Sequence, residues 1–340
     1  MKPNSHGSPH RRRCRRRAFL IFPFLVLSLL AAVPSRTSRS AQQTTPPAPQ
    51  PSRKDSGAVK FTVTVVSANS GFIAGLPQAD FSVWEGKTQR EITHFRHDDL
   101  PLSVCVLIDV SGSVAARTLN AARQAVARFV ELSHPANEYF VGEFGENRRE
   151  LVGWTRDARE ILQGLEKLAM PAGQAKPKPR GSTAFYDACS AALDVVARRP
   201  NPKHVVLLIT DGQDNQSRST LAQLRRKVKE SGALLYALSI MEPGEHSDYS
   251  RVAGLAILEE LTLDSGGKAY FPETKKEVDE MVERIAVQLR HQYEIGFTPA
   301  NAARPGEWNK VKIKVTPSRP SLKNLSVRGR NGYFSTQPSP

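Results

Sequence analysis

Apolar and polar residues alternate strictly where the folded part of the chain begins. Every second residue from position 59 to position 65 is apolar, which predicts a strand with one buried face: Val59, Phe61, Val63 and Val65. Apolar residues at 81–84 and at 92–95 flank the turn Glu85-Gly86-Lys87, so we expect a hairpin there that ends near Asp99.

The pattern changes between residues 102 and 289 to strands alternating with helices. Leu102–Ile108 and His204–Thr210 are apolar almost throughout, as expected for strands covered on both faces. Helical spacing of apolar residues predicts helices at 119–130, 158–168, 183–198, 220–231, 255–265 and 277–289, and shorter apolar runs predict strands at 139–144, 151–154, 233–240 and 268–271. This order predicts an α/β fold with a doubly wound, mostly parallel sheet.

Alternation of period two returns after His291. Strands are expected at 293–297, 311–315, 325–327 and 333–334. Neither this flank nor the one at 59–98 holds enough strands for a stable sheet of its own. We therefore expect the two flanks to form one small β-sandwich in which the α/β domain is inserted. The predicted division is an export segment (1–41), a linker (42–56), the first sandwich part (57–99), the α/β domain (100–290) and the second sandwich part (291–335).

The positive charge of the chain is concentrated at its start. The net charge is +15, and residues 1–41 hold nine Lys or Arg and no acid, which leaves +6 on the remainder. No basic cluster is evident in the folded part, and this argues against nucleic-acid binding. The apolar run Ala18–Val33 follows the basic cluster, which is the pattern of a secretory signal. Residues 42–55, rich in proline and polar residues, read as an extended tether.

Two alternatives stay open for the export segment. Its apolar run has 16 residues including Pro23, shorter than the ~20 needed to span a bilayer comfortably, so cleavage is favoured over an uncleaved membrane anchor. Arg16-Arg17-Ala18-Phe19-Leu20 also fits the core of a twin-arginine signal, which we rank second to ordinary secretion. The protein is expected to be periplasmic, secreted or tethered to the cell envelope. Cys105 and Cys189, the cysteines outside this segment, are expected to be buried free thiols.

Three loops place hydroxyl and carboxylate side chains at strand ends or helix starts. Asp109-Val110-Ser111-Gly112-Ser113 and Thr210-Asp211-Gly212 each follow a buried strand, and Gly181-Ser182-Thr183 precedes a helix. Ligands of parallel α/β sheets bind outside the carboxyl ends of the strands, where such loops converge. Two carboxylates and three hydroxyls should therefore meet in one crevice: Asp109, Ser111, Ser113, Thr183 and Asp211.

This set of oxygen donors suits a hard cation, Mg²⁺ first and then Mn²⁺ or Ca²⁺. The three hydroxyls can coordinate it as neutral ligands, while the two aspartates hold its waters. Such an ion is under-neutralised at its open face. A carboxylate from a protein partner would complete the coordination shell, which makes the ion a bridge between proteins.

The run Asp109-x-Ser111-x-Ser113, together with Thr183 and Asp211, resembles the metal-ion-dependent adhesion site of von Willebrand factor A domains. The resemblance covers about residues 100–290, and all five positions match. The segments at 75–87 and 329–334 are similar to an exported von Willebrand factor A family abundant in Acidobacteria. The resemblance implies a non-enzymatic, metal-dependent binding module outside the cytoplasm.

Each motif also has a plainer interpretation. A lone DxSxS run or a lone threonine can cap a helix, and Asp-Gly is a common turn; their joint placement after buried strands favours the metal site. Asp187 and Asp214 are expected to be solvent-exposed or capping residues. The basic, proline-rich loop 171–180 is either solvated or favours an acidic partner through Lys176, Lys178 and Arg180.

Two other functions compete with adhesion. An aspartate-nucleophile phosphatase needs a second acid two residues after the first, and position 111 is serine; a serine hydrolase needs a nucleophile elbow, which is missing from the sequence. A hydrolase is therefore the weaker alternative. The other is an envelope scaffold in which the metal only stabilises the loops.

Overall fold

The fold is taken from a computed structural model that describes residues 58–67, 71–111, 116–168, 182–240, 249–299 and 304–335. The predicted export segment and linker lie outside the described residues, as do Ser113, Lys176, Lys178 and Arg180. Within the described ranges, none of the helices combines the length and apolar character needed to cross a bilayer.

A six-stranded sheet forms the centre of the α/β domain. Its strand order is β11-β10-β9-β6-β7-β8, and every pair is parallel except β7 with β8. The strands are β6 (Leu102–Asp109), β7 (Glu138–Phe144), β8 (Arg148–Thr155), β9 (Lys203–Ile209), β10 (Leu234–Leu238) and β11 (Lys268–Tyr270). The parallel order follows from helical crossovers between strands, which return the chain to the same edge of the sheet each time.

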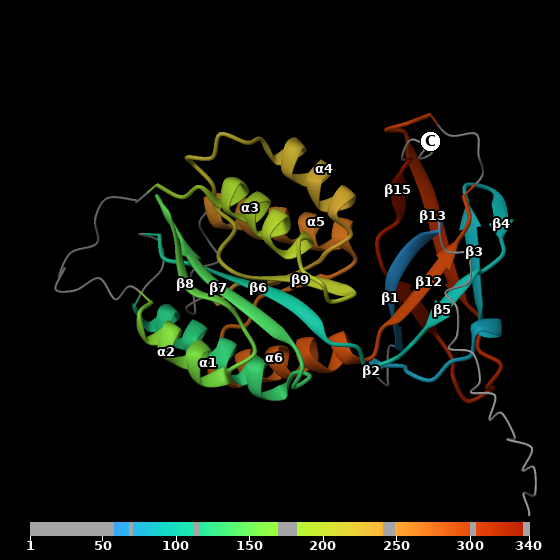
Figure 1. The fold of residues 1–340 in the computed structure, drawn as a ribbon, viewed down its shortest axis with the longest axis horizontal. Helices are drawn as coiled ribbons and strands as arrows, with labels where there is room; N and C mark the ends of the chain where they lie inside the picture. Colours follow the sequence, from blue (N-terminus) through green and yellow to red (C-terminus); the bar gives the residue numbers. More distant parts are fainter. Residues whose placement is uncertain are drawn as a thin grey trace, which may run out of the picture. The chain divides into compact units, whose positions relative to one another are not determined.

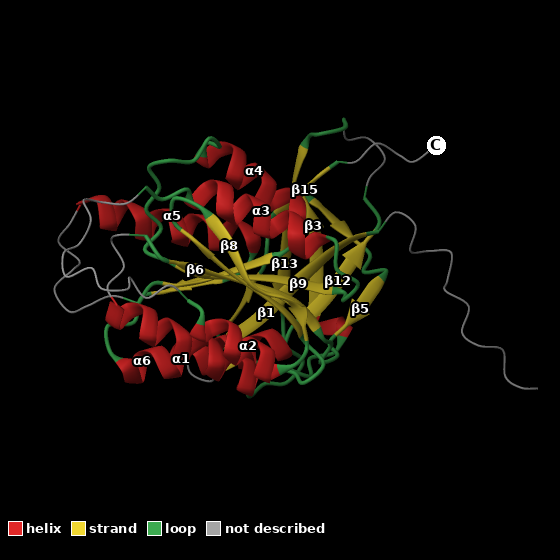
Figure 2. Cartoon of the chain, turned by 60° about the vertical axis from the view of Figure 1, so that its left-hand side comes forward, coloured by secondary structure: helices red, strands yellow, loops and turns green. Residues whose placement is uncertain are grey.

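Helices cover both faces of this sheet (Figures 1 and 2). One layer contains α1 (Ala116–Leu132), α2 (Ala158–Glu166) and α6 (Lys275–Arg290); the other contains α3 (Phe185–Ala197), α4 (Leu221–Ser231) and α5 (Tyr249–Ser265). The predicted doubly wound α/β fold is confirmed.

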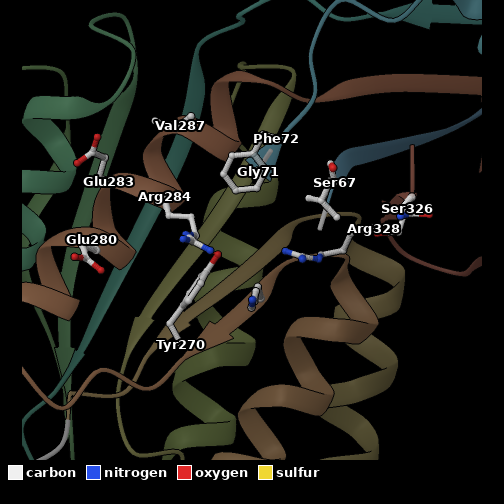
Figure 3. Close-up of a pocket in the computed structure, with 13 residues that line it drawn as sticks. Ser67, Gly71, Phe72, Tyr270, Glu280, Glu283, Arg284, Val287, Ser326 and Arg328 are labelled. Atoms are coloured by element: carbon white, nitrogen blue, oxygen red, sulfur yellow. The ribbon is translucent and has the colours of Figure 1, made fainter. Parts of the chain in front are cut away.

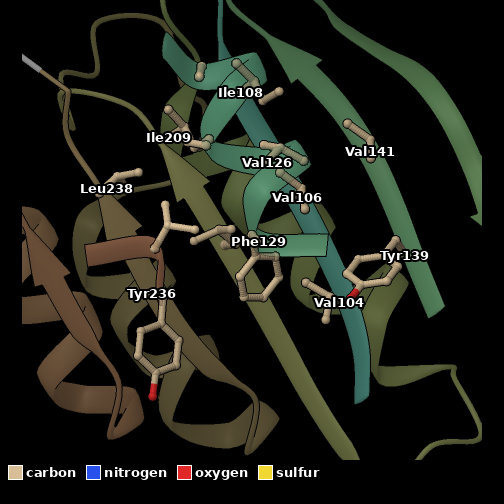
Figure 4. Packing of buried hydrophobic residues seen from close by; sticks show 14 of the residues in the cluster. Val104, Val106, Ile108, Val126, Phe129, Tyr139, Val141, Ile209, Tyr236 and Leu238 are labelled. Carbon is tan, nitrogen blue, oxygen red and sulfur yellow. The ribbon is translucent and has the colours of Figure 1, made fainter. Parts of the chain in front are cut away.

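Buried aliphatic residues join the sheet to the first layer. Val104, Val106 and Ile108 of β6 face Val126 and Phe129 of α1 in the same cluster, and all five are at most 1% exposed (Figure 4). Burying one such side chain contributes about 1.5–3 kcal/mol. All eight residues of β6 are buried, which explains why its sequence is apolar except for Ser103 and the terminal Asp109.

The flanks form two antiparallel sheets, each of which contains strands from both flanks. The first has the order β14-β1-β12-β5 with β2 beside β1, and the second has the order β15-β13-β3-β4. The strands are β1 (Val59–Ser67), β2 (Gly71–Phe72), β3 (Phe81–Glu85), β4 (Thr88–Arg90), β5 (His94–Arg96), β12 (Tyr293–Phe297), β13 (Trp308–Val315), β14 (Leu325–Arg328) and β15 (Gly332–Phe334). The insertion of the α/β fold between paired flanks is therefore confirmed, whereas the division into domains that fold separately stays a prediction.

The predicted hairpin at 81–95 is wrong in part. β3 pairs with β4, but β5 joins the other sheet and pairs with β12. The ring centres of Phe81 and Phe95 lie 5.4 Å apart. Phe95 thus packs on Phe81 from the opposite sheet, and this contact in the sandwich core replaces the strand pairing that the sequence suggested.

Cys105 of β6 and Cys189 of α3 are buried free thiols, as expected. Burial raises the pKa of both, that of Cys189 to about 12. Both therefore remain protonated and chemically inert at neutral pH.

Candidate metal centre

Adjacent parallel strands bring two of the predicted loops together. β6 and β9 are neighbours in register, with Ile108 opposite Ile209, so Asp109 and Asp211 leave the sheet at the same edge. Thr183 approaches from the loop that precedes α3. Four predicted ligands in the described residues are buried: Asp109 is 1%, Thr183 3%, Ser111 6% and Asp211 8% exposed.

Asp109 accepts hydrogen bonds from Ser111 and Thr210. The backbone N–H of Ser111 donates to its Oδ1 at 2.9 Å, and the Thr210 hydroxyl donates to its Oδ2 at 2.6 Å. Burial and, secondarily, the negative charge of Asp211 raise the pKa of Asp109 to about 6. A buried carboxylate close to a second negative charge lowers the stability of the folded protein. A cation bound between the two carboxylates would remove this repulsion.

Thr183 is fixed through its backbone. Its N–H donates to the Asn215 side-chain carbonyl at 2.7 Å, and its own carbonyl oxygen accepts from the N–H groups of Asn215 and Gln216 at 3.0 and 3.1 Å. These bonds explain why α3 begins at Phe185 and not, as predicted, at Thr183. The N-cap residue of α3 is Ala184, so Thr183 does not serve as the helix cap. No hydrogen bond of its hydroxyl to another described residue is present, and the hydroxyl can act as a ligand.

Asp211 is oriented by the residue two positions later. The Gln213 backbone N–H donates to Oδ1 and its side-chain Nε2 donates to Oδ2, both at 3.1 Å. Each of three further residues thus positions one predicted ligand: Thr210, Gln213 and Asn215. The sequence analysis assigned none of them a role. Their role could have been inferred from the polar run Thr210–Gln216 directly after a buried strand, because this run is long for a simple turn.

Asp187 and Asp214 have structural roles. Asp214 lies at the start of α3, as predicted for a capping residue, whereas Asp187 is neither exposed nor a helix cap. Asp214 accepts from the backbone N–H of Tyr186 at 3.1 Å, in the first turn of α3. Asp187 accepts from the backbone N–H groups of Arg218 and Ser219 at 2.9 and 3.1 Å. Both carboxylates are thereby used to hold the loop after β9 against α3.

The donors present fit a hard cation. They are two carboxylates and the hydroxyls of Ser111 and Thr183, with no sulfur or imidazole. Accordingly, the described residues contain no group of three or more His, Cys, Asp or Glu side chains suited to a metal ion. A site of this composition depends on hydroxyls and water, and its ion keeps part of its positive charge.

Comparison with known proteins finds a family model that part of the chain matches. Residues 104–213 match the model of the von Willebrand factor type A domain. The matched stretch begins in β6 and ends just after Asp211, so it includes all five residues of the predicted site. The narrower resemblance to the exported Acidobacteria-type family stays a prediction.

Individual proteins are similar to this chain at low identity. The human inter-alpha-trypsin inhibitor heavy chain H4 is 24% identical over 212 residues, which are 56% of this chain and 21% of that protein. The chain thus spans about a fifth of the length of this relative. Among solved structures, the proximal thread matrix protein 1 of mussel byssus with a zinc-occupied MIDAS motif is 14% identical, with a TM-score of 0.43 over 56% of this chain and 48% of that one. BatB of Bacteroides thetaiotaomicron is 16% identical, with a TM-score of 0.41 over 55% of this chain and 98% of that one.

Proposed function

We propose that the protein is an exported binding protein that uses a divalent cation on its type A domain to capture a carboxylate of a protein partner. The observation that supports this proposal is that Asp109 and Asp211 are buried at the ends of adjacent strands, with the buried Thr183 hydrogen-bonded to Asn215 of the loop after β9. Their chemistry matches an ion that keeps an open coordination position.

The predicted ligands would contact the ion in two ways. The hydroxyls of Ser111, Ser113 and Thr183 would bind it directly, and Asp109 and Asp211 would hold its waters. Neutral direct ligands leave the cation electrophilic, and a carboxylate from outside is then its strongest available ligand. Mg²⁺ is the first candidate, followed by Mn²⁺ and Ca²⁺.

The surface beside the ion offers contacts to a partner. α5 packs through Gly254 against the backbone of Asp211 and Gly212. Near the start of the same helix, Tyr249 is 87% and Val252 50% exposed. Exposed large apolar side chains next to a polar centre are typical of binding surfaces. We expect the partner to contact them while its carboxylate reaches the ion. The loop with Lys176, Lys178 and Arg180 would favour an acidic partner in the same way.

Binding without catalysis is part of the proposal. The chemistry of an aspartate nucleophile needs an acid where Ser111 stands. A metal that only stabilises the loops is the second candidate, and the burial of the two mutually repelling aspartates is the observation in its favour. Export is proposed from the basic and apolar N-terminal segment, with the body secreted, periplasmic or tethered to the envelope.

Calorimetric titration of the protein with Mg²⁺, Mn²⁺ and Ca²⁺ tests the ion, and pull-down from envelope extract tests the partner. Wild type should bind cation and partner, and Asp109→Ala should lose both. Asp279→Ala removes an exposed carboxylate from α6 and should behave as wild type. If Asp109→Ala binds no cation but still recovers every partner, the metal is structural and the adhesion proposal is wrong.

A further inference from the structure

A pocket lies between the first sandwich sheet and the α/β domain (Figure 3). Its volume is about 570 Å³, enough for a small organic molecule. β1, β2 and β14 line it from the sandwich, and β11 and α6 line it from the α/β domain. Its lining includes the apolar side chains Phe72 and Val287, the phenol of Tyr270 and the cations Lys268, Arg284 and Arg328.

Three cations line this pocket without a counter-ion. No described carboxylate forms an ion pair with Lys268, Arg284 or Arg328, whereas Arg225 pairs with Asp264 and Arg199 with Glu138. Lys268 and Arg328 are half-buried and Arg284 is exposed. Burial, and then the charges of Arg328 and Arg284, lower the pKa of Lys268. The three cations therefore repel one another, at a cost to stability that an anion would remove.

Two buried phenol groups adjoin the cations. Within the described residues, the hydroxyls of Tyr236 and Tyr270 have no acceptor for their protons, although Arg328 lies close enough to interact with the Tyr270 oxygen, and the two residues are 0% and 5% exposed. Tyr270 lies between Arg284 and Arg328, with its hydroxyl directed toward Arg284 (Figure 3). A buried hydroxyl without a partner is unfavourable unless it donates to a ligand.

The two acidic residues of the pocket neutralise its three cations only in part, and neither forms an ion pair with them. Glu280 and Glu283 are exposed on α6, and Glu280 lies 3.7 Å from Lys276. Both carboxylates lie on the far side of Arg284 from Arg328 (Figure 3). Phe72 and Val287 add an apolar wall, and Val287 is 38% exposed. The pocket therefore combines a cationic end with an apolar one.

We infer that this pocket binds a small organic anion. Its oxyanion group would accept hydrogen bonds from Arg284, Arg328 and the Tyr270 hydroxyl, with Lys268 adding charge, and its apolar body would lie against Phe72 and Val287. The ligand would connect β11 and α6 of the α/β domain to β2 and β14 of the sandwich. This site is independent of the metal centre, because none of its residues belongs to the three metal-site loops.

The test compares an organic oxyanion, naphthalene-2-sulfonate, with the inorganic oxyanion sulfate. Naphthalene-2-sulfonate and sulfate are titrated into the full-length protein by calorimetry, and thermal unfolding is followed with each. Naphthalene-2-sulfonate should bind more tightly and raise the unfolding temperature. Arg328→Gln should weaken its binding by about tenfold, as expected for losing hydrogen bonds to a charged group. Lys310→Gln removes an exposed cation from β13 and should leave binding unchanged.

A second variant separates a binding role from a structural one. Lys268→Met removes a cation that has no ion pair with a described carboxylate and lies 4.9 Å from the centre of the Tyr270 ring. The repulsion it relieves offsets the lost ring contact, so without ligand the variant should unfold at about the same temperature as wild type, and it should lose most of the stabilisation by naphthalene-2-sulfonate. The inference is wrong if the wild type binds neither probe, or if Lys310→Gln weakens binding as much as Arg328→Gln. Equal affinity for sulfate and naphthalene-2-sulfonate would show that the apolar wall does not contribute to binding, and the inference of an organic ligand would be wrong.

Discussion

Gly254 of α5 lies so close to the loop after β9 that a Cβ on it would come within 2.4 Å of the Asp211 carbonyl oxygen. The contact is mutual, since a Cβ on Gly212 would lie 2.4 Å from the Gly254 carbonyl oxygen. Gly212 has φ +77°, a value that side-chain-bearing residues rarely adopt. The backbone that carries the Asp211 side chain is thus placed by the close approach of two glycines 42 positions apart in the chain.

Gly254→Ala should weaken cation binding. Alanine usually stabilises a helix interior by about 0.5–1 kcal/mol relative to glycine, but here its Cβ must displace backbone. We expect the loop to move and Mg²⁺ affinity to fall by about tenfold, in the range found when supporting groups of a metal site are changed. Calorimetry measures this, with Ala256→Gly on the exposed side of α5 as control. Unchanged affinity in Gly254→Ala would show that the contact does not position Asp211.

Thr210 should matter for the metal although it is not a predicted ligand. Its hydroxyl donates to Asp109 and accepts from the Gly212 N–H at 3.1 Å, so it links the two aspartate loops. Thr210→Val keeps the shape and removes both bonds, and we expect cation affinity about tenfold lower or worse. Thr210→Ser keeps the hydroxyl and should retain most of the affinity. If both variants bind alike, the hydroxyl has no positioning role.

Glu138 should make stability pH-dependent at the opposite edge of the sheet. Its carboxylate accepts from Arg199 Nε at 2.9 Å, from Arg199 Nη2 at 2.7 Å and from the Ser103 hydroxyl at 2.6 Å, and the residue is 5% exposed. These bonds, those to Arg199 foremost, lower the pKa of Glu138 below its usual 4.5. The folded state then binds its proton less readily than the unfolded state, so the stabilisation is complete above 4.5 and is lost as the pH falls through the folded-state pKa.

Glu138→Gln should therefore lower the free energy of unfolding by about 1–3 kcal/mol at neutral pH, as expected for hydrogen bonds to a charged partner. The difference from wild type should shrink as the pH falls below the pKa of the wild-type carboxyl. Urea denaturation at several pH values measures it. A difference in the free energy of unfolding that stays constant down to strongly acidic pH would contradict this account.

Much of the architecture could be predicted because its signals are local. Six of the eight buried residues of β6 are apolar, and Thr220 with Gln223 forms a capping box at the start of α4. The start of α5 was predicted too late, at Leu255 and not at Tyr249. Its first turns expose Tyr249 and Val252, so no helical apolar period appears there.

The candidate metal centre was predictable only in part, because only some of its features are local in the sequence. Asp109, Thr183 and Asp211 follow from strand ends and loop composition. The supporting bonds of Thr210 and Asn215 join residues far apart in the chain, and no local pattern reports such pairs. The pairing of β5 with β12 was missed because a short strand of three residues gives no indication of which of two sheets it joins.

Gly266 provides a last prediction, on the coupling of the sandwich to the α/β domain. It follows α5 with φ +89°, and a Cβ on it would lie 2.7 Å from the backbone N of Arg330 and from Cα of Gly329. Gly232 at the end of α4 has φ +66° but would meet only the Arg330 side chain, at 3.9 Å. Both Gly→Ala changes incur the cost of the left-handed conformation, about 1–2 kcal/mol. Only in Gly266→Ala does the new Cβ also push the backbone of Gly329 and Arg330 away from the α/β domain. This variant should therefore lower the free energy of unfolding by more than Gly232→Ala. Equal losses in urea denaturation would mean that the contact with Gly329 and Arg330 adds nothing to stability.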